Sequence, residues 1–216
     1  MNSKRLLAIA SLISKNDSVV DIGCDHAYLD IYLIKNKLCK QAIASDISEG
    51  ALSQAKDNIE KYGLTKKIKT IVSDGLEKID IKGVNTIVIS GMGTKTALEI
   101  LANEKTNYVE KIIIQSNNNI KELKLTMNKR RYKIIKELVI KENNKYYTIL
   151  EYAHGREKLS FATVLVGNYN KKNLEYYKYL LNKNNVILGK LPKYKLLKII
   201  ELKISNSILK KYIKKS

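Results

Sequence analysis

The sequence has no tryptophan, a single proline and only two cysteines, Cys24 and Cys39. These cysteines form no Cys-x-x-Cys pair and have no histidine cluster nearby, which argues against a disulfide framework and against a structural zinc site. We therefore expect no metal and a reducing, cytoplasmic compartment. Acidic residues are also scarce, with 21 Asp and Glu against 40 Lys and Arg, so the formal net charge is +19.

Long hydrophobic runs are missing as well, because no segment approaches the roughly 20 apolar residues of a membrane-spanning helix. Residues 6–13 follow Lys4 and Arg5 and could mimic a secretory signal, but polar residues 14–17 end this short run. Leu6, Ile9 and Ile13 fall on one helical face. This spacing favours an amphipathic helix that packs on a sheet, and we expect no membrane partner.

The positive charge is unevenly distributed along the chain. Residues 1–152 carry a net charge of +7, whereas the much shorter segment 153–216 carries +12. An AT-rich genome raises the lysine content everywhere, so a merely lysine-rich soluble surface is one explanation. Codon bias alone should not remove acids from one end of the chain, however, and a basic appendage favours a nucleic-acid partner.

The main part of the chain alternates between short β-branched runs and helical patterns. The expected strands are residues 18–22, 41–45, 68–72, 86–89, 111–115, 132–141 and 146–152. The expected helices are residues 28–37, 48–62, 96–102 and 120–131. Five strands that alternate with helices predict an α/β fold with a parallel sheet and right-handed crossovers. The last two strands are joined at residues 142–145 and predict a closing antiparallel hairpin.

The pattern changes towards the C-terminus, and we expect two domains, residues 1–155 and residues 156–216. An apolar stripe marks a helix over residues 174–188, Gly189 is expected to end it, and Pro192 to open a second helix. Two helices joined by so short a connection must form an antiparallel hairpin, or coiled coil. Its outer lysines suit RNA phosphates, although a dimerising coiled coil with solvated lysines is an alternative. We expect a monomer or weak dimer with no obligate protein partner.

Polar groups follow the strand ends, where open α/β sheets bind ligands. Gly23 lets the backbone approach a ligand between Asp21 and Asp25, and Asp46 stands where an acid can accept from ribose hydroxyls. Asp74 follows the third strand, where a carboxylate can accept from an adenine amine. Each acid alone could be a helix cap or a turn residue, but three such acids at one edge favour a nucleoside ligand.

The choice of cofactor depends on the missing phosphate cradle. A dinucleotide site usually needs Gly-x-Gly-x-x-Gly, but only Gly23 is present, and Asp25 would repel a pyrophosphate. S-Adenosylmethionine has no phosphate and carries a sulfonium, so the acids favour it, with S-adenosylhomocysteine as product. The predicted cofactor-binding residues are Asp21, Gly23, Asp46, Ile47, Asp74, Gly75, Gly91 and Met92.

Four motifs together resemble one enzyme family: Asp-Ile-Gly-Cys-Asp-His-Ala-Tyr-Leu at 21–29, Ser-Asp-Gly-Leu at 73–76, Ile-Ser-Gly-Met-Gly at 89–93 and Ile-Gln-Ser-Asn at 114–117. They resemble the bacterial tRNA (adenine-N1)-methyltransferases of the TrmK family. The resemblance implies a class I (Rossmann-like) methyltransferase domain with a C-terminal coiled coil, and methylation of adenine 22 in the tRNA D-arm. The family usually has proline where Asp30 stands, and proline where Ser116 stands.

The expected chemistry assigns roles to the side chains around the first turn. Methylated N1 of adenine is cationic, and a carboxylate at Asp25 can stabilise that charge, with His26 orienting it or contacting RNA. Tyr28 can stack on the base, and Asn117 can donate to the base or to a phosphate. The lysines expected to contact RNA are Lys178, Lys195, Lys198 and Lys203. The alternatives are a small-molecule methyltransferase and a non-catalytic RNA-binding protein on the same fold.

Overall fold

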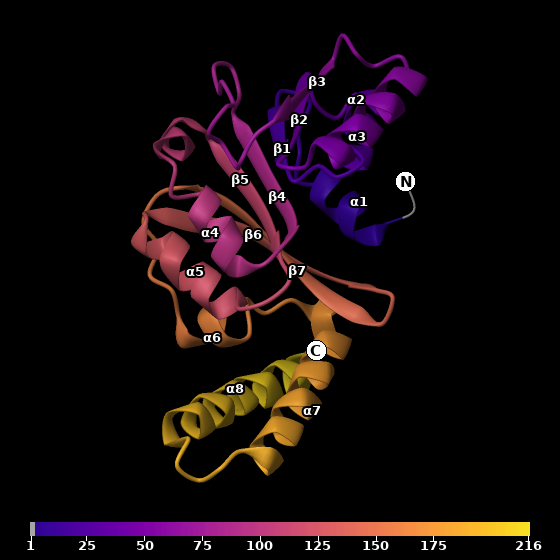
Figure 1. Cartoon of the computed structure of the whole chain (residues 1–216). Helices are drawn as coiled ribbons and strands as arrows, with labels where there is room; N and C mark the ends of the chain where they lie inside the picture. Colours follow the sequence, from indigo (N-terminus) through magenta and orange to yellow (C-terminus); the bar gives the residue numbers. More distant parts are fainter. Residues whose placement is uncertain (1–2) are drawn as a thin grey trace. The chain divides into compact units, whose positions relative to one another are not determined.

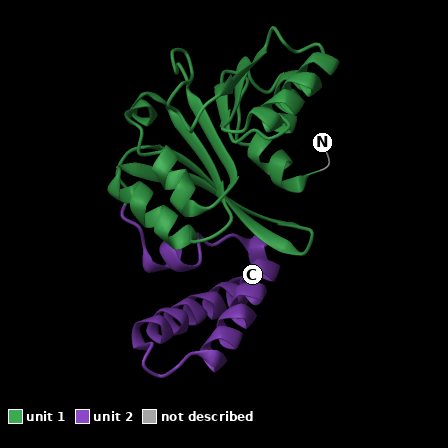
Figure 2. Cartoon of the chain, in the orientation of Figure 1, with its two compact units in different colours: residues 1–157 green, residues 158–216 purple. Residues whose placement is uncertain are grey.

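The computed structural model describes residues 3–216, which form two compact units. The first unit ends at Glu157 and the second comprises Lys158–Ser216 (Figure 2). The first contains the sheet with its covering helices, and the second is entirely helical (Figure 1).

The first unit is built on one seven-stranded sheet with the order β3-β2-β1-β4-β5-β7-β6. Its strands are β1 (Ser18–Ile22), β2 (Gln41–Asp46), β3 (Ile68–Val72), β4 (Thr86–Met92), β5 (Lys111–Ser116), β6 (Tyr132–Glu142) and β7 (Lys145–His154). The first five strands pair in parallel, and β7 pairs antiparallel with both β5 and β6. The predicted parallel sheet with a closing hairpin is confirmed.

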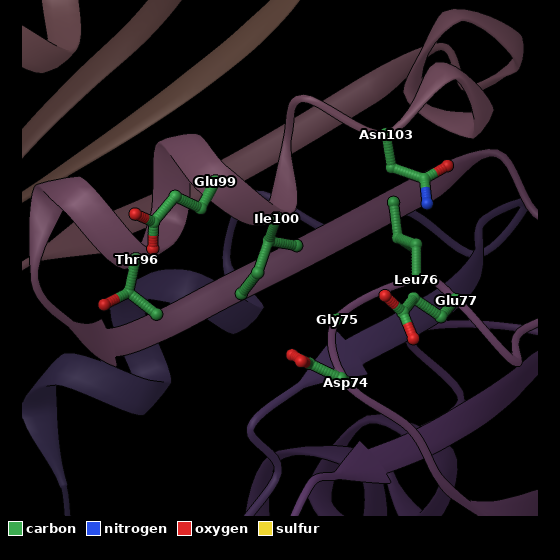
Figure 3. Close-up of a pocket in the computed structure, with 8 residues that line it drawn as sticks. All are labelled: Asp74, Gly75, Leu76, Glu77, Thr96, Glu99, Ile100 and Asn103. Carbon is green, nitrogen blue, oxygen red and sulfur yellow. The ribbon is translucent and has the colours of Figure 1, made fainter.

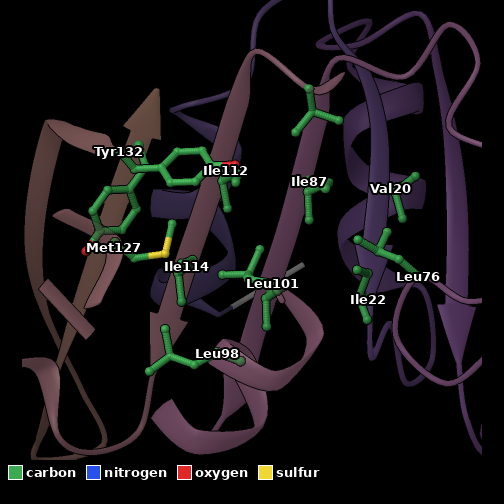
Figure 4. Close-up of a cluster of buried hydrophobic side chains, with 14 of the residues drawn as sticks. Val20, Ile22, Leu76, Ile87, Leu98, Leu101, Ile112, Ile114, Met127 and Tyr132 are labelled. Atoms are coloured by element: carbon green, nitrogen blue, oxygen red, sulfur yellow. The ribbon is translucent and has the colours of Figure 1, made fainter. Parts of the chain in front are cut away.

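Helices cover both faces of this sheet. They are α1 (Lys4–Ala10), α2 (Tyr28–Lys35), α3 (Glu49–Lys61), α4 (Thr94–Ile100) and α5 (Ile120–Lys129), with a 3-10 turn η1 at Glu104–Tyr108. Neighbouring strand residues point to opposite faces. Val20 and Ile87 thus join the cluster beneath α4 and α5 (Figure 4), whereas Val19 and Val88 pack with Ile9 of α1. Because both faces are covered, the central strands are apolar throughout, and their polar groups lie only at the ends.

The fourth strand and the helix after it differ from the predicted bounds. The strand was expected to end at residue 89, but it continues to Met92 because the register shifts between Ser90 and Met92, around Gly91 with a φ of +82°. The helix begins at Thr94, two residues earlier than expected. Asn118 fixes this start, since its Oδ1 accepts a 3.0 Å hydrogen bond from the Thr94 N–H.

The second unit contains α6 (Phe161–Leu165), a 3-10 turn η2 (Lys171–Asn173), α7 (Leu174–Lys190) and α8 (Leu196–Lys215). The expectation that Gly189 ends the first helix was wrong, because α7 continues to Lys190. Pro192 does not open the second helix either: its carbonyl accepts from the Lys195 N–H in the connecting turn, and α8 starts at Leu196. Gly189 is exposed, and the helix ends within two residues after it, so the glycine stands close to the end of α7 but not at it.

The two long helices form the predicted antiparallel hairpin. Tyr177 near the start of α7 lies 5.2 Å, ring to ring, from Tyr212 near the end of α8. Further along, buried Asn184 donates to Ser205 Oγ at 3.1 Å and to Asn206 Oδ1 at 3.0 Å. Buried polar groups between packed helices fix their register. Within residues 3–216, no helix combines the length and apolarity needed to cross a membrane.

Candidate active site

The turn after β1 is built on Gly23. The N–H groups of Gly23 and Cys24 both donate to the Ser45 carbonyl, at 2.8 and 2.9 Å, which ties this turn to the end of β2. Gly23 has a φ of +76°, and a Cβ there would collide with Met92 Cε. The left-handed backbone conformation therefore favours glycine, and a larger residue would also displace the end of the Met92 side chain.

The next residues adopt a backbone conformation that the sequence does not reveal. Asp25 and Ala27 have φ values of +52° and +56°, in the left-handed region that non-glycine residues avoid. The result is an exposed Asp25 side chain (73% of its surface) with Oδ1 3.5 Å from His26 Nε2. Two such residues in one short turn point to a conformation retained for function.

Asp46 at the tip of β2 connects two of the strand ends. Its Oδ2 accepts a 3.2 Å hydrogen bond from the Asp25 N–H, and its Oδ1 accepts a 2.9 Å bond from the Ser48 N–H. Ile47, next to it, exposes 67% of its surface. Two backbone bonds hold the carboxylate in place, while the adjacent apolar side chain is open to a ligand.

Two hollows of about 350 Å³ each lie at this edge of the sheet. The residues around the first include Arg5, Asp21, Gly23, Asp25, Tyr28 and Met92. Around the second, the Asp74–Gly75 turn after β3 faces Thr96 and Ile100 of α4 (Figure 3). The predicted cofactor residues are thus divided between two neighbouring surfaces of the first unit, with Asp46 and Ile47 lining neither hollow.

A pair of buried carboxyl groups stands at the first hollow. Burial is the main reason that the pKa of Asp21 is raised to about 7; the Arg5 guanidinium opposes this shift, and the nearby Asp46 charge contributes to it. Asp30 in the first turn of α2 is fully buried, and burial together with the Asp21 charge raises its pKa well above the usual range. At neutral pH the pair therefore holds at least one proton.

Arg5 and Gln115 are site residues that the sequence reading missed. Arg5 Nη1 donates to Gln115 Oε1 at 2.7 Å and to Ser90 Oγ at 3.2 Å. Gln115 Oε1 also accepts from the Gly91 N–H at 3.1 Å, so one buried amide connects α1 with the turn of β4. A glutamine directly after the apolar run 112–114 was the available signal, but Arg5 gave none.

The predicted RNA contacts fall into different environments. Tyr28 is exposed by 52%. Asn117 is already engaged, donating from Nδ2 to the Gly91 carbonyl at 2.7 Å and accepting from Gln115 Nε2 at Oδ1. In the hairpin, Lys178 and Lys198 pair with Glu175 and Glu201, while Lys195 lies over the ring of Tyr194 and Lys203 is exposed. Their role in RNA binding stays a prediction.

The parallel sheet, its closing antiparallel hairpin and the glycine turn among strand-end acids define a class I methyltransferase fold. The model of a family described as a methyltransferase domain matches residues 2–150. The structure of M. capricolum TrmK in complex with S-adenosyl-homocysteine superposes on this chain with a TM-score of 0.83 at 34% identity, and the match covers 99% of this chain and 98% of that one. This chain belongs to the methyltransferase-domain family and, within it, to the TrmK family.

Two comparisons with Bacillus subtilis proteins agree with this assignment. The tRNA (adenine(22)-N(1))-methyltransferase of strain 168 is 36% identical over 135 residues, which is 62% of this chain and 57% of that relative. The sequence match thus spans less than two thirds of the relative's length. The structure of the B. subtilis m1A22 tRNA methyltransferase TrmK covers 99% of both chains, with a TM-score of 0.82 at 29% identity. The likeness in fold therefore includes the C-terminal helices.

Proposed function

We propose that this protein transfers a methyl group from S-adenosylmethionine to N1 of adenine 22 in tRNA. The observation that carries the proposal is the set of acids around a glycine turn that has no phosphate cradle. The proposal is supported by the likeness to the structure of the B. subtilis m1A22 tRNA methyltransferase TrmK, over 99% of this chain. It is also supported by the match of 62% of this chain to the B. subtilis tRNA (adenine(22)-N(1))-methyltransferase.

The residues at the strand ends fit this cofactor. Gly23 lines the first hollow, and without a side chain its backbone would be accessible to a ligand there. Asp46 would hold the ribose, Ile47 and Gly75 would flank the adenine, and Asp74 would accept from its amine. Asp21, Gly91 and Met92 would surround the amino-acid part, with Arg5 offering a cation for its carboxylate. When bound, S-adenosylmethionine supplies an electrophilic methyl group on a cationic sulfur.

Asp25 and His26 are the proposed catalytic residues. N1 of adenine lies in a Watson–Crick pair, so the base must be unpaired or extruded before it can react. The ring becomes cationic as N1 gains the methyl group, and the exposed Asp25 carboxylate is placed to stabilise that charge and to accept from N6. The left-handed backbone at Asp25 fixes its direction, and His26 at 3.5 Å orients it.

The Gly91–Met92 turn leaves room for a flat base. Asn117 stabilises this turn through its bond to the Gly91 carbonyl, and its N–H donates to the Met92 carbonyl at 2.9 Å. We propose that Tyr28 stacks on the target base, and that Asn117 acts on RNA mainly by shaping the turn. Residues that orient a base in this way raise the rate without taking part in bond making.

The second unit is the proposed RNA-binding domain. We place the boundary between the two proposed domains near residues 155–157. Its lysines, including Lys178, Lys195, Lys198 and Lys203, would contact phosphates and position the tRNA without reading its sequence. We also propose a cytoplasmic protein that acts as a monomer or weak dimer with no obligate partner.

The test uses the purified chain, S-adenosylmethionine and an unmodified tRNA transcript. Mass spectrometry of the digested RNA should find N1-methyladenosine, and a transcript with guanosine at position 22 should gain none. Methylation at another base would contradict the proposed target. Methylation of a small molecule instead of RNA, or cofactor binding without transfer, would favour the other two functions.

A further inference from the structure

A third hollow, of about 380 Å³, lies beside the proposed active site and has no role in the function proposed so far. It is lined by Tyr28, Ile31, Tyr32, Lys35, Asn36 and Tyr62. Five of these residues lie on or directly after α2, and Tyr62 lies at the end of α3. Two helices of the first unit therefore present three tyrosines to one open space.

Tyr28 belongs to this hollow and also to the one that contains Asp25 and Gly23. Its ring centroid lies 5.5 Å from that of His26, with the planes tilted by 43°. The two hollows are thus adjacent, with Tyr28 as their shared wall. A ligand in the third hollow would sit next to whatever occupies the proposed catalytic one.

The lining suits a flat, aromatic and anionic ligand. Tyr28 and Tyr62 expose 52% and 47% of their surface, which is unusual for aromatic side chains gathered at one place. The Lys35 ammonium lies 4.2 Å from the Tyr62 ring centroid, at the same hollow. Aromatic faces beside a lysine are how proteins hold single-stranded nucleic acid, because every base has a π-face and every nucleotide a phosphate.

We propose that the third hollow binds an unpaired base next to the target adenine in the RNA. The base stacks on Tyr62 and Tyr32, and Lys35 contacts the adjoining phosphate. This inference rests on the proposed function, since it needs an RNA substrate whose target base has left its helix. Holding a neighbouring nucleotide keeps the strand open, and so it favours entry of the target into the space beyond Tyr28.

The occupant is a nucleotide rather than an apolar peptide for two reasons. The hollow shares Tyr28 as a lining residue with the hollow proposed to receive the substrate base. Its charged residue is a lysine, in a chain with a net charge of +19, so an anionic strand is attracted to it. If the hollow bound a protein segment instead, the affinity for RNA would not depend on Tyr62 or on the bases next to the target.

The experiment combines Tyr62→Ala with tRNA transcripts that each lack one base near the target. Affinity is measured by fluorescence anisotropy with the full chain, and cofactor binding by calorimetry. We expect Tyr62→Ala to weaken binding of the intact tRNA roughly tenfold or more, with cofactor affinity unchanged. One abasic position next to the target should weaken the wild-type protein by a similar factor, but should cause no further loss in the variant.

The matched control is Tyr108→Ala, which removes a 76%-exposed tyrosine elsewhere in the first unit and should leave RNA affinity as in wild type. Tyr62→Leu keeps an apolar side chain but removes the aromatic ring. It replaces the alanine variant in these measurements if Tyr62→Ala lowers the melting temperature. Equal affinities of the Tyr62 and Tyr108 variants would overturn the inference, and so would equal sensitivity of wild type and variant to every abasic position. Failure of the wild type to methylate tRNA would instead refute the proposed function itself.

Discussion

The two units of this protein use charge in opposite ways. In the first unit, acids lie at the ends of β1, β2 and β3, and Asp21 and Asp30 have strongly raised pKa values because they are buried. In the second unit only two acids exist, Glu175 and Glu201, and each pairs with a lysine three positions away, Lys178 and Lys198. The first arrangement concentrates acidic groups at one edge of the sheet, as the proposed chemistry requires, whereas the second spreads positive charge, as the proposed contact with RNA requires.

The largest effect is expected from removing Asp25, which tests whether the acids of the first unit take part in the chemistry. Asp25→Ala should lower kcat roughly 100- to 1,000-fold, because the carboxylate that stabilises the cationic base is lost. Cofactor affinity in calorimetry and the melting temperature should stay near wild type. Asp57→Ala, at an exposed position on α3, is the control and should keep full activity. Near-normal turnover of the Asp25 variant would show that another group stabilises the charge.

Removing lysines of the hairpin tests whether the basic second unit binds RNA. Lys198→Ala with Lys203→Ala should weaken tRNA binding about tenfold and reduce the slope of log Kd against log salt by about 1 to 2. Cofactor binding and kcat at saturating tRNA should be unchanged. The control pair, Lys66→Ala with Lys82→Ala in the first unit, removes the same charge. If both pairs lower affinity equally, the basic hairpin has no special role.

The buried amides of the hairpin offer a change in stability rather than in binding. Asn184→Ala removes donors to Ser205 and Asn206 and leaves buried oxygens without them, which should cost about 1–3 kcal/mol in the free energy of unfolding. Asn185→Ala, at the exposed neighbour that accepts from Asn206, should cost less. Chemical denaturation of the full chain measures both. Equal costs would mean that burial at Asn184 is unimportant.

The smallest expected effect concerns pH. The folded protein keeps protons on Asp21 and Asp30 that the unfolded chain releases near pH 4, so this contribution to stability declines as pH rises towards about 7. We expect the melting temperature to be a few degrees lower at pH 8 than at pH 5. Asp30→Asn should shrink that difference, because it removes one of the two acids. Asp57→Asn should keep the wild-type difference, and an undiminished difference in Asp30→Asn would refute the coupling.

The sequence predicted the features that depend on local pattern. Apolar runs bounded by polar residues predicted every strand of the sheet, and the acids at the ends of β1, β2 and β3 pointed to the ligand edge. These signals are readable because a strand buried on both faces must be apolar along its whole length. The hairpin followed from the helical stripe around Tyr177 and Leu209 in the same way.

Other features depend on contacts between distant residues and could not be predicted. Arg5 reaches Gln115 across 110 positions, which no local pattern encodes. The left-handed backbone at Asp25 and Ala27 arises where surrounding structure overrides the preference of these residues. Burial of Asp30 was also hidden, because an acid in the first turn of a helix normally faces water. The sequence therefore predicted the candidate site residues but not the hydrogen bonds that hold them.

The side-chain amide of Gln115 determines which groups donate and which accept in the hydrogen bonds around the Gly91–Met92 turn. Its oxygen accepts from Arg5 and Gly91, and its nitrogen donates to the Asn117 oxygen, which in turn leaves the Asn117 nitrogen for the Gly91 carbonyl. A glutamate of the same shape would satisfy Arg5 but set two acceptors against each other at Asn117. Each donor in this set of hydrogen bonds therefore meets an acceptor only when an amide, not a carboxylate, stands at position 115. Gln115→Glu, an exchange of one atom, would break this chain of bonds at Asn117 and loosen the Gly91–Met92 turn.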